Sequence, residues 1–108
     1  MPRRRITFRQ LETFSAVARL HSFSRAAEEL HLTQPAVSIQ IRQIAETIGL
    51  PLFEQNGREI ALTAAGQEML ATVRELDDIW NRFESAIDDL KGFKRGKLRV
   101  ALVTTAKH

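Results

Sequence analysis

The first fifty residues carry apolar side chains at helical spacing in three segments, which short polar breaks separate. A predicted helix over about residues 8–20 places Leu11, Phe14 and Ala18 on one face. At its start, Thr7 and Gln10 stand three residues apart, the spacing of a capping box in which each side chain satisfies a free backbone amide. The pattern therefore predicts an amphipathic helix with a defined beginning and one face in a core.

Two further helices are predicted before residue 50. Ser24 is a good N-cap for a short helix over residues 25–30. Thr33 can cap a third helix with Pro35 in its first turn, where a missing amide costs little. This helix should end just before Gly49, because a glycine can adopt the left-handed conformation that terminates helices.

Beyond Gly49 the pattern changes to two short runs of mixed polarity, residues 52–55 and 59–62. They flank Asn56-Gly57-Arg58, and Asn-Gly between two such runs is a strong hairpin signal. Residues 1–62 are therefore predicted to form a mainly α, winged helix-turn-helix domain with three helices and a two-stranded wing.

A long helix is predicted over residues 63–91, capped by Thr63 and ended by Gly92, with a length of roughly 42 Å. Its apolar residues recur alternately four and three apart, which is a heptad stripe: Met69, Val73, Leu76, Trp80, Phe83, Ile87 and Leu90. Such a stripe predicts pairing with a second helix, although the first turn near Met69 can pack on the chain's own domain. Residues 92–108 are expected to be a hinge and, from the alternation over residues 98–103, the first strand of a truncated domain.

The third predicted helix has a buried and an outer face. At 100° per residue the buried face, within about 60°, holds Val37, Ile41, Ile44 and Ile48. The outer side presents Gln34, Pro35, Ser38, Ile39, Arg42 and Glu46. A glutamine can bond adenine twice, a hydroxyl can bond a base or a phosphate, and an isoleucine or proline can pack on a thymine methyl. Free amides at the amino end also suit a phosphate.

The alternative to DNA recognition is a three-helix core whose outer face is merely polar. Ile39 favours DNA recognition, because it is expected to be exposed among residues that can bind a groove, on a helix that directly follows a short helix and a turn.

Charge divides the chain into three regions. Residues 1–62 carry 8 Lys+Arg and 6 Asp+Glu, residues 63–91 carry 3 and 7, and residues 92–108 carry 5 and 0. The net charge of +3 and the pI near 10.0 permit nucleic-acid binding. Because a phosphate backbone repels the acidic middle, that region is expected to face water or protein while the amino-terminal part meets DNA.

The composition and the absence of other motifs argue against enzymes, metal-binding proteins and membrane proteins. Without cysteine there is no disulfide, thiolate metal site or cysteine nucleophile, and a reducing cytoplasm is the simplest compartment. The three histidines lie in unrelated segments, and no glycine-rich phosphate loop is present. No apolar run approaches the roughly 20 residues of a membrane span, and no signal peptide is visible. We expect no catalysis, metal, cofactor or membrane.

Five motifs in order, within residues 6–92, resemble LysR-type transcriptional regulators: FRQLETF (8–14), SRAAEEL (24–30), TQPAVS (33–38), GLPLFE (49–54) and LTAAG (62–66). The resemblance implies a dimeric or tetrameric bacterial regulator that reads an interrupted palindrome, with the third helix in the major groove and the wing along the minor groove. It gives DNA-facing roles to Thr33, Gln34, Pro35, Ser38 and Arg42.

Two positions depart from the pattern of many family members, which have arginine where this chain has Ile39 and Gln55. Both still belong to the expected interface. Arg58 at the wing tip and Arg9 are expected to replace these arginines in contacts with phosphate, as are Arg3, Arg4 and Arg5. For this last run, a solvated arm is an equal alternative.

The segments 33–38 and 52–55 are especially similar to the branch of the family that controls carbon-fixation (Rubisco) operons. The family implies that the long helix pairs antiparallel with that of a second chain, and that small-molecule effectors bind a C-terminal domain outside these residues. The competing hypothesis is a helical interaction module without DNA affinity, which salt-sensitive DNA binding would exclude.

Overall fold

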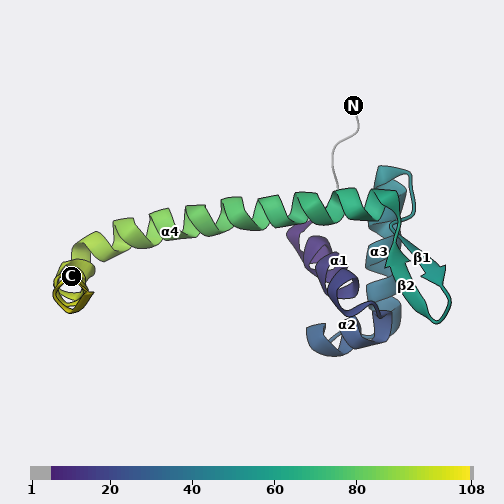
Figure 1. Ribbon diagram of the computed structural model, residues 1–108, viewed down its shortest axis with the longest axis horizontal. Helices are drawn as coiled ribbons and strands as arrows, with labels where there is room; N and C mark the ends of the chain where they lie inside the picture. The colour runs from purple at the N-terminus through teal and green to yellow at the C-terminus, as the bar shows by residue number, and fades with distance from the viewer. Residues whose placement is uncertain (1–5, 108) are drawn as a thin grey trace. The chain divides into compact units, whose positions relative to one another are not determined.

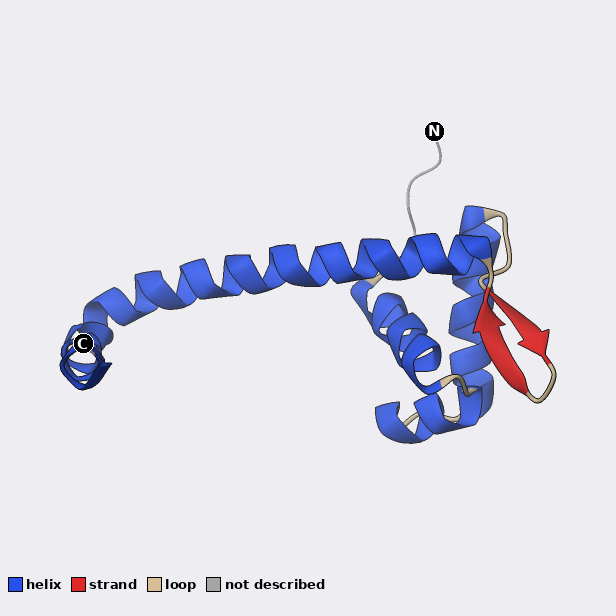
Figure 2. Cartoon of the chain, viewed as in Figure 1, coloured by secondary structure: helices blue, strands red, loops and turns tan. Residues whose placement is uncertain are grey.

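The computed structural model describes the backbone of residues 6–107 and the side chains of residues 6–92. In chain order its elements are α1 (Phe8–Leu20), α2 (Phe23–Leu30), α3 (Gln34–Ile48), β1 (Phe53–Asn56), β2 (Glu59–Leu62) and α4 (Ala64–Lys107), as drawn in Figure 1 and Figure 2. The chain divides into two units, of which the first ends at Val73. This unit has the predicted winged helix-turn-helix fold.

Side-chain caps fix the beginnings of α1 and α3 as the sequence predicts. The Gln10 amide donates to Thr7 Oγ1 at 3.1 Å, and the Thr7 amide donates to Gln10 Oε1 at 2.9 Å, which completes the capping box. Thr33 caps α3. At the other end of α3, Gly49 has a φ of 95°, so the predicted glycine stop is confirmed.

The beginning of α2 differs from the prediction. The Arg25 amide donates to Ser22 Oγ at 3.1 Å, so Ser22 is the N-cap and Ser24 lies inside the helix. Phe23 thereby enters the first turn, and its ring meets the Phe53 ring edge-on at 5.9 Å between centroids. This aromatic contact with a distant strand holds the first turn that Ser22 caps.

The wing is an antiparallel pair in which Phe53 lies opposite Leu62 and Asn56 opposite Glu59. It turns at Gly57, whose φ of 68° is a conformation that glycine adopts without strain. β1 begins one residue later than predicted, at Phe53, and the side chain of the preceding Leu52 is buried in the core.

The core of the first unit joins all four helices and the start of the wing. Its largest fully buried side chains are Phe14, Ile44, Leu52, Val17, Val37 and Thr13. The prediction that Ile48 belongs to the buried face is wrong. Ile48 is the last residue of α3, beyond the part of the helix that packs on the core, and it is exposed.

Thr63 closes the base of the wing. Its hydroxyl donates to the Pro51 carbonyl at 2.6 Å, and its amide donates to the Leu52 carbonyl at 3.0 Å. The same hydroxyl accepts from the Gly66 amide at 3.0 Å, so Thr63 caps α4 as predicted. Gly66 is required by space, since a Cβ there would lie 2.2 Å from the Leu52 carbonyl oxygen.

The carboxyl-terminal prediction of a hinge and a strand is not what the structure has. α4 passes Gly92 and continues to Lys107, through the segment 98–103 that was expected to be a strand. A glycine in a helix costs only about 1 kcal/mol. A helix also satisfies its own backbone groups, whereas a single strand needs a partner strand, and the described residues offer none to this segment. None of the described helices is long and apolar enough to cross a bilayer.

Candidate nucleic-acid interface

We define the outer face of α3 as the side chains of Gln34, Pro35, Ser38, Ile39 and Arg42. The opposite side of the helix is buried through Val37, Ile41 and Ile44. Ile39 is 47% exposed, and of the other four only Ser38 is half-buried rather than exposed. Within the described residues, the face predicted to meet DNA is therefore largely uncovered.

The amino end of α3 is less open to an anion than the sequence suggests. Thr33 Oγ1 accepts from the Ala36 amide at 3.2 Å, and Pro35 has no amide proton. The expectation that several free amides await a phosphate is therefore wrong at these positions. Thr33 keeps the proton of its hydroxyl, with which it can still donate to an anion.

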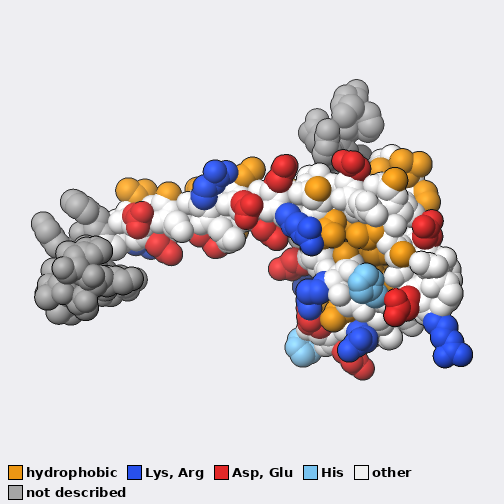
Figure 3. Space-filling view, in the orientation of Figure 1, with side chains coloured by type: hydrophobic (Ala, Val, Ile, Leu, Met, Phe, Trp, Pro, Cys, Tyr) orange, Lys and Arg blue, Asp and Glu red, His pale blue; other side chains and the backbone are white. Residues whose placement is uncertain are grey.

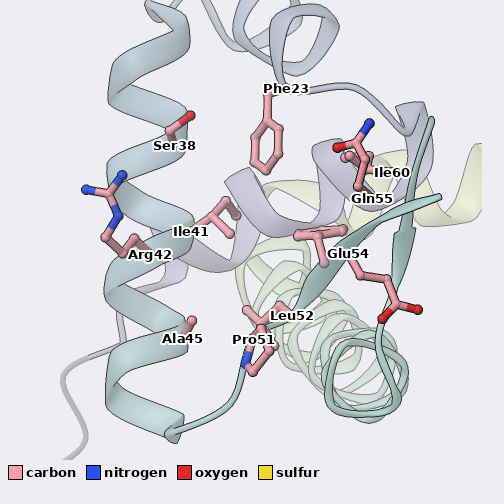
Figure 4. Close-up of a pocket in the computed structure, with 11 residues that line it drawn as sticks. Phe23, Ser38, Ile41, Arg42, Ala45, Pro51, Leu52, Glu54, Gln55 and Ile60 are labelled. Carbon is pink, nitrogen blue, oxygen red and sulfur yellow. The ribbon is translucent and has the colours of Figure 1, made fainter. Parts of the chain in front are cut away.

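An open hollow of about 330 Å³ separates α3 from β1 (Figure 4). Ser38 borders it from α3 and Gln55 from β1, while Phe23 and Leu52 contribute to an apolar floor. Gln55 Nε2 donates to the Gly57 carbonyl at 3.2 Å, which ties this side chain to the turn of the wing. Arg42 lines it as well, so three of the predicted DNA-binding side chains border one hollow.

The predicted cations come from three elements. Arg42 lies on α3, Arg58 in the wing turn and Arg9 in the first turn of α1, and all three are exposed. In Figure 3 basic and acidic side chains alternate over the visible face of the first unit without a single basic patch. Arg3, Arg4 and Arg5 lie outside the described residues.

Arg19 is engaged within the domain. It forms an ion pair with Glu29, linking α1 to α2. The hydrogen bond from Arg19 lowers the pKa of the Glu29 carboxyl below its ordinary value, and the same bond raises the pKa of the Arg19 guanidinium. Because both side chains are largely exposed, solvent screens the pair, and its contribution to folding is small.

Sequence reasoning missed a set of hydrogen bonds on the flank of α3 that faces α1. Gln10 Nε2 donates to Gln43 Oε1 at 2.9 Å, and Thr13 Oγ1 lies 2.6 Å from Gln40 Oε1. Thr13 sits among apolar neighbours at the centre of α1 and is only 1% exposed. Its polarity within an otherwise apolar face was the signal that could have found these contacts.

The predicted pairing stripe on α4 divides into two parts. Val73 is 4% exposed in the core of the first unit, and Met69 packs against that core. The chain's own domain therefore covers Val73 and part of Met69, which is the packing expected for the first turn of the helix, and the pairing role of the stripe stays a prediction. Leu76, Trp80, Phe83 and Leu90 are exposed and Ile87 is half-buried, all in the second unit.

Two aromatic rings form the centre of the exposed part. Trp80 is 48% and Phe83 50% exposed, and their ring centroids lie 5.1 Å apart. Trp80 Nε1 donates to Glu84 Oε2 at 2.9 Å. The planes of the Trp80 and Phe83 rings are tilted by 36° to one another. Ile79, which the stripe omits, is also exposed and widens the apolar surface.

Among the described residues, no group of three or more His, Asp or Glu side chains could hold a metal ion.

A family model described as bacterial regulatory helix-turn-helix protein, lysR family, matches residues 8–67. The RuBisCO operon transcriptional regulator of Acidithiobacillus ferrooxidans is 50% identical over 105 residues, which are 97% of this chain and 34% of the relative. The HTH-type transcriptional regulator CbbR of Rhodospirillum rubrum is 53% identical over 100 residues, 93% of this chain and 34% of the relative. The chain thus spans about a third of the length of these curated relatives.

A solved structure of similar fold is that of Vibrio fischeri DarR in complex with DNA. It has a TM-score of 0.73 and 34% sequence identity, over 82% of this chain and 30% of that one.

Proposed function

The chain belongs to the LysR family of bacterial regulatory helix-turn-helix proteins, and from this premise we propose that it binds double-stranded promoter DNA sequence-specifically. In this proposal α3 enters the major groove and the wing follows the adjacent backbone. The function is binding and not catalysis, and its place is the bacterial cytoplasm, at the nucleoid.

The exposure of the outer face of α3 is the observation that carries the proposal. Val37, Ile41 and Ile44 hold the helix to the core, so the opposite side chains are left for a ligand. They combine an amide, a hydroxyl, a guanidinium and apolar groups, which is the mixture that base edges and thymine methyls require.

Each side chain of the interface has a proposed role. Gln34 bonds a base edge, Pro35 and Ile39 pack on thymine methyls, and Ser38 donates to a base or a phosphate. Thr33 and Gln55 contact the backbone. Electrostatic attraction to phosphates comes from Arg42, Arg58 and Arg9, which release counterions on binding.

The proposed target is the promoter of a carbon-fixation operon. Two relatives about half identical to this chain support it, since one is named for the RuBisCO operon and the other is a CbbR regulator. The chain spans only about a third of the length of these relatives. We therefore propose that effector binding and transcriptional control require parts of a longer protein outside the described residues.

We propose that two chains pair through the exposed part of α4 and place two outer faces on two half-sites. Uncovered aromatic and aliphatic surface of this extent supports pairing, because such surface marks interfaces. A two-fold dimer then reads an interrupted palindrome, and dimers associate further into tetramers in a longer protein.

A fluorescence-anisotropy titration at two salt concentrations tests the function. The probes are the duplex that the chain enriches from a randomised interrupted-palindrome library and a scrambled duplex of equal composition. We expect tighter binding to the enriched duplex and weaker binding to both at higher salt. Binding that is absent or insensitive to salt would favour the helical interaction module.

A matched pair of glutamine variants tests the position of the interface. Gln34→Ala should lower affinity for the enriched duplex by roughly 1–3 kcal/mol, the value of a good bidentate base contact. Gln67→Ala, at an exposed position of α4, should leave it unchanged. An equal loss on scrambled DNA would instead make Gln34 a phosphate contact.

A further inference from the structure

The flank of α3 that faces α1 is held by two polar contacts, which we call the α1–α3 ladder. One rung is Gln10–Gln43, with 2.9 Å between Nε2 and Oε1. The other is Thr13–Gln40, with 2.6 Å between Oγ1 and Oε1. The rungs stand three residues apart on each helix, so they join neighbouring turns of α1 to neighbouring turns of α3.

Hydrogen-bonding capacity suggests how the inner rung is completed. Thr13 Oγ1 also lies 3.1 Å from the Arg9 carbonyl, and a hydroxyl has one proton to donate. The contact with Gln40 Oε1 is the shorter of the two, and 2.6 Å is the length of an O–H···O hydrogen bond. Thr13 Oγ1 therefore donates to Gln40 Oε1, and the inner rung is a direct hydrogen bond between α1 and α3.

The outer rung continues to the start of α1. Gln10 Oε1 accepts from the Thr7 amide while Gln10 Nε2 donates to Gln43. One side chain therefore both caps α1 and holds α3. The hydrogen bond from the Thr7 amide therefore restrains the Gln10 side chain, and through it the outer rung of the ladder, at the beginning of α1.

Apolar packing fixes which face of α3 is buried, and a hydrogen bond restricts the rotation of the helix more sharply than burial does. Val37, Ile41 and Ile44 bury area, and the free energy of burial depends little on direction. A rotation of about 20° moves a side-chain tip roughly 5–6 Å from the helix axis by about 2 Å. That shift would break a hydrogen bond, whose donor–acceptor distance is confined to about 2.5–3.0 Å for a hydroxyl donor and about 2.7–3.2 Å for an amide donor.

On these grounds we propose that Thr13 and Gln40, supported by Gln10 and Gln43, are positioning residues for DNA recognition. They set the rotation of α3 about its own axis, and so the direction in which the outer face meets base edges. None of the four has to touch DNA. The inference rests on the proposed function, because rotation matters only if this face reads bases.

The decisive variant replaces both partners of the inner rung with apolar groups of similar shape. Thr13→Val leaves Gln40 without its partner and should lower both stability and the affinity ratio between enriched and scrambled duplex. The double variant Thr13→Val with Gln40→Met should recover thermal stability, because two apolar groups leave no unsatisfied polar atom. Its affinity ratio should stay lowered on the order of tenfold, the value of one misaligned base contact.

Thr13→Ser keeps the hydroxyl and is the control, with an affinity ratio expected near that of the unaltered chain. Where Thr13→Val fails to fold, Gln43→Met on the exposed outer rung supplies the same comparison, with a smaller loss of ratio.

The outcomes separate the two claims. If the unaltered chain does not discriminate between the duplexes, the proposed function fails and the positioning role with it. If it discriminates and the stable double variant discriminates equally well, only the positioning role is overturned, and the ladder contributes to stability alone.

Discussion

Ile39 brings a branched aliphatic side chain to an interface that otherwise offers polar groups. Since it has no donor or acceptor, its proposed contact is with the methyl group of a thymine in the major groove. Individual thymines of the enriched duplex can be replaced by deoxyuridine, which removes that methyl. At one position the unaltered chain should lose about 0.8 kcal/mol of binding free energy, the value of one buried carbon group.

Ile39→Ala should bind more weakly and no longer respond to deoxyuridine at that position. If both proteins respond equally, the methyl contact belongs to another residue, for which Pro35 is the first candidate.

Gly66 is a second residue with a sharp expectation. In Gly66→Ala the new methyl group meets the Leu52 carbonyl oxygen at 2.2 Å, a backbone atom that cannot turn aside. The free energy of unfolding should fall by about 1–3 kcal/mol, as in other overpacked sites. Gly92→Ala is the control, because a Cβ there meets nothing within 4 Å. It should be neutral or stabilising by up to about 1 kcal/mol. Urea denaturation measures both, and equal effects would contradict the close approach.

At the scale of elements, features set by neighbouring residues were predictable. The capping box of α1, the Thr33 cap and the Gly49 stop depend on groups within a few residues of one another. The same holds for the turn of the wing at Gly57.

Features that depend on distant contacts were not predictable from local pattern. Ser22 caps α2 in place of the predicted Ser24, and the contact of Phe23 with Phe53 that accompanies this start joins residues far apart in the sequence. Val73 fits the heptad stripe and the core equally well, and only the fold shows that the core covers it. The Thr13–Gln40 contact joins residues 27 positions apart, and no spacing rule connects them.

The division of the α4 stripe predicts opposite effects for two of its members. Trp80→Glu should abolish pairing and halve the mass measured by light scattering while the first unit stays folded, because a carboxylate cannot be buried without a partner. Val73→Ala should lower the free energy of unfolding by about 2 kcal/mol through lost burial and a cavity, with pairing retained. An unchanged mass in Trp80→Glu would remove the support for an α4 interface.

For the whole molecule, salt dependence measures how many cations meet phosphates. Arg9, Arg42 and Arg58 occur twice in a dimer, so log K should fall with log salt at a slope of up to about −5, at about 0.9 per neutralised phosphate. Arg58→Ala should weaken this slope by about 2. Arg19→Ala is the matched control, because Arg19 is paired with Glu29 and should not contribute. If the two variants change the slope equally, the wing turn is not a phosphate contact.

The closure at Thr63 has a consequence for how such a domain can be altered. The hydrogen bonds to Pro51 and Leu52 close the wing at its base, while residues 56–58 at its tip are exposed and lie outside the core. Changes of length or sequence at residues 56–58 should therefore disturb the core little. The tip is therefore a natural place to graft new sequences, through which operator preference could be retuned in the laboratory while the rest of the domain is kept.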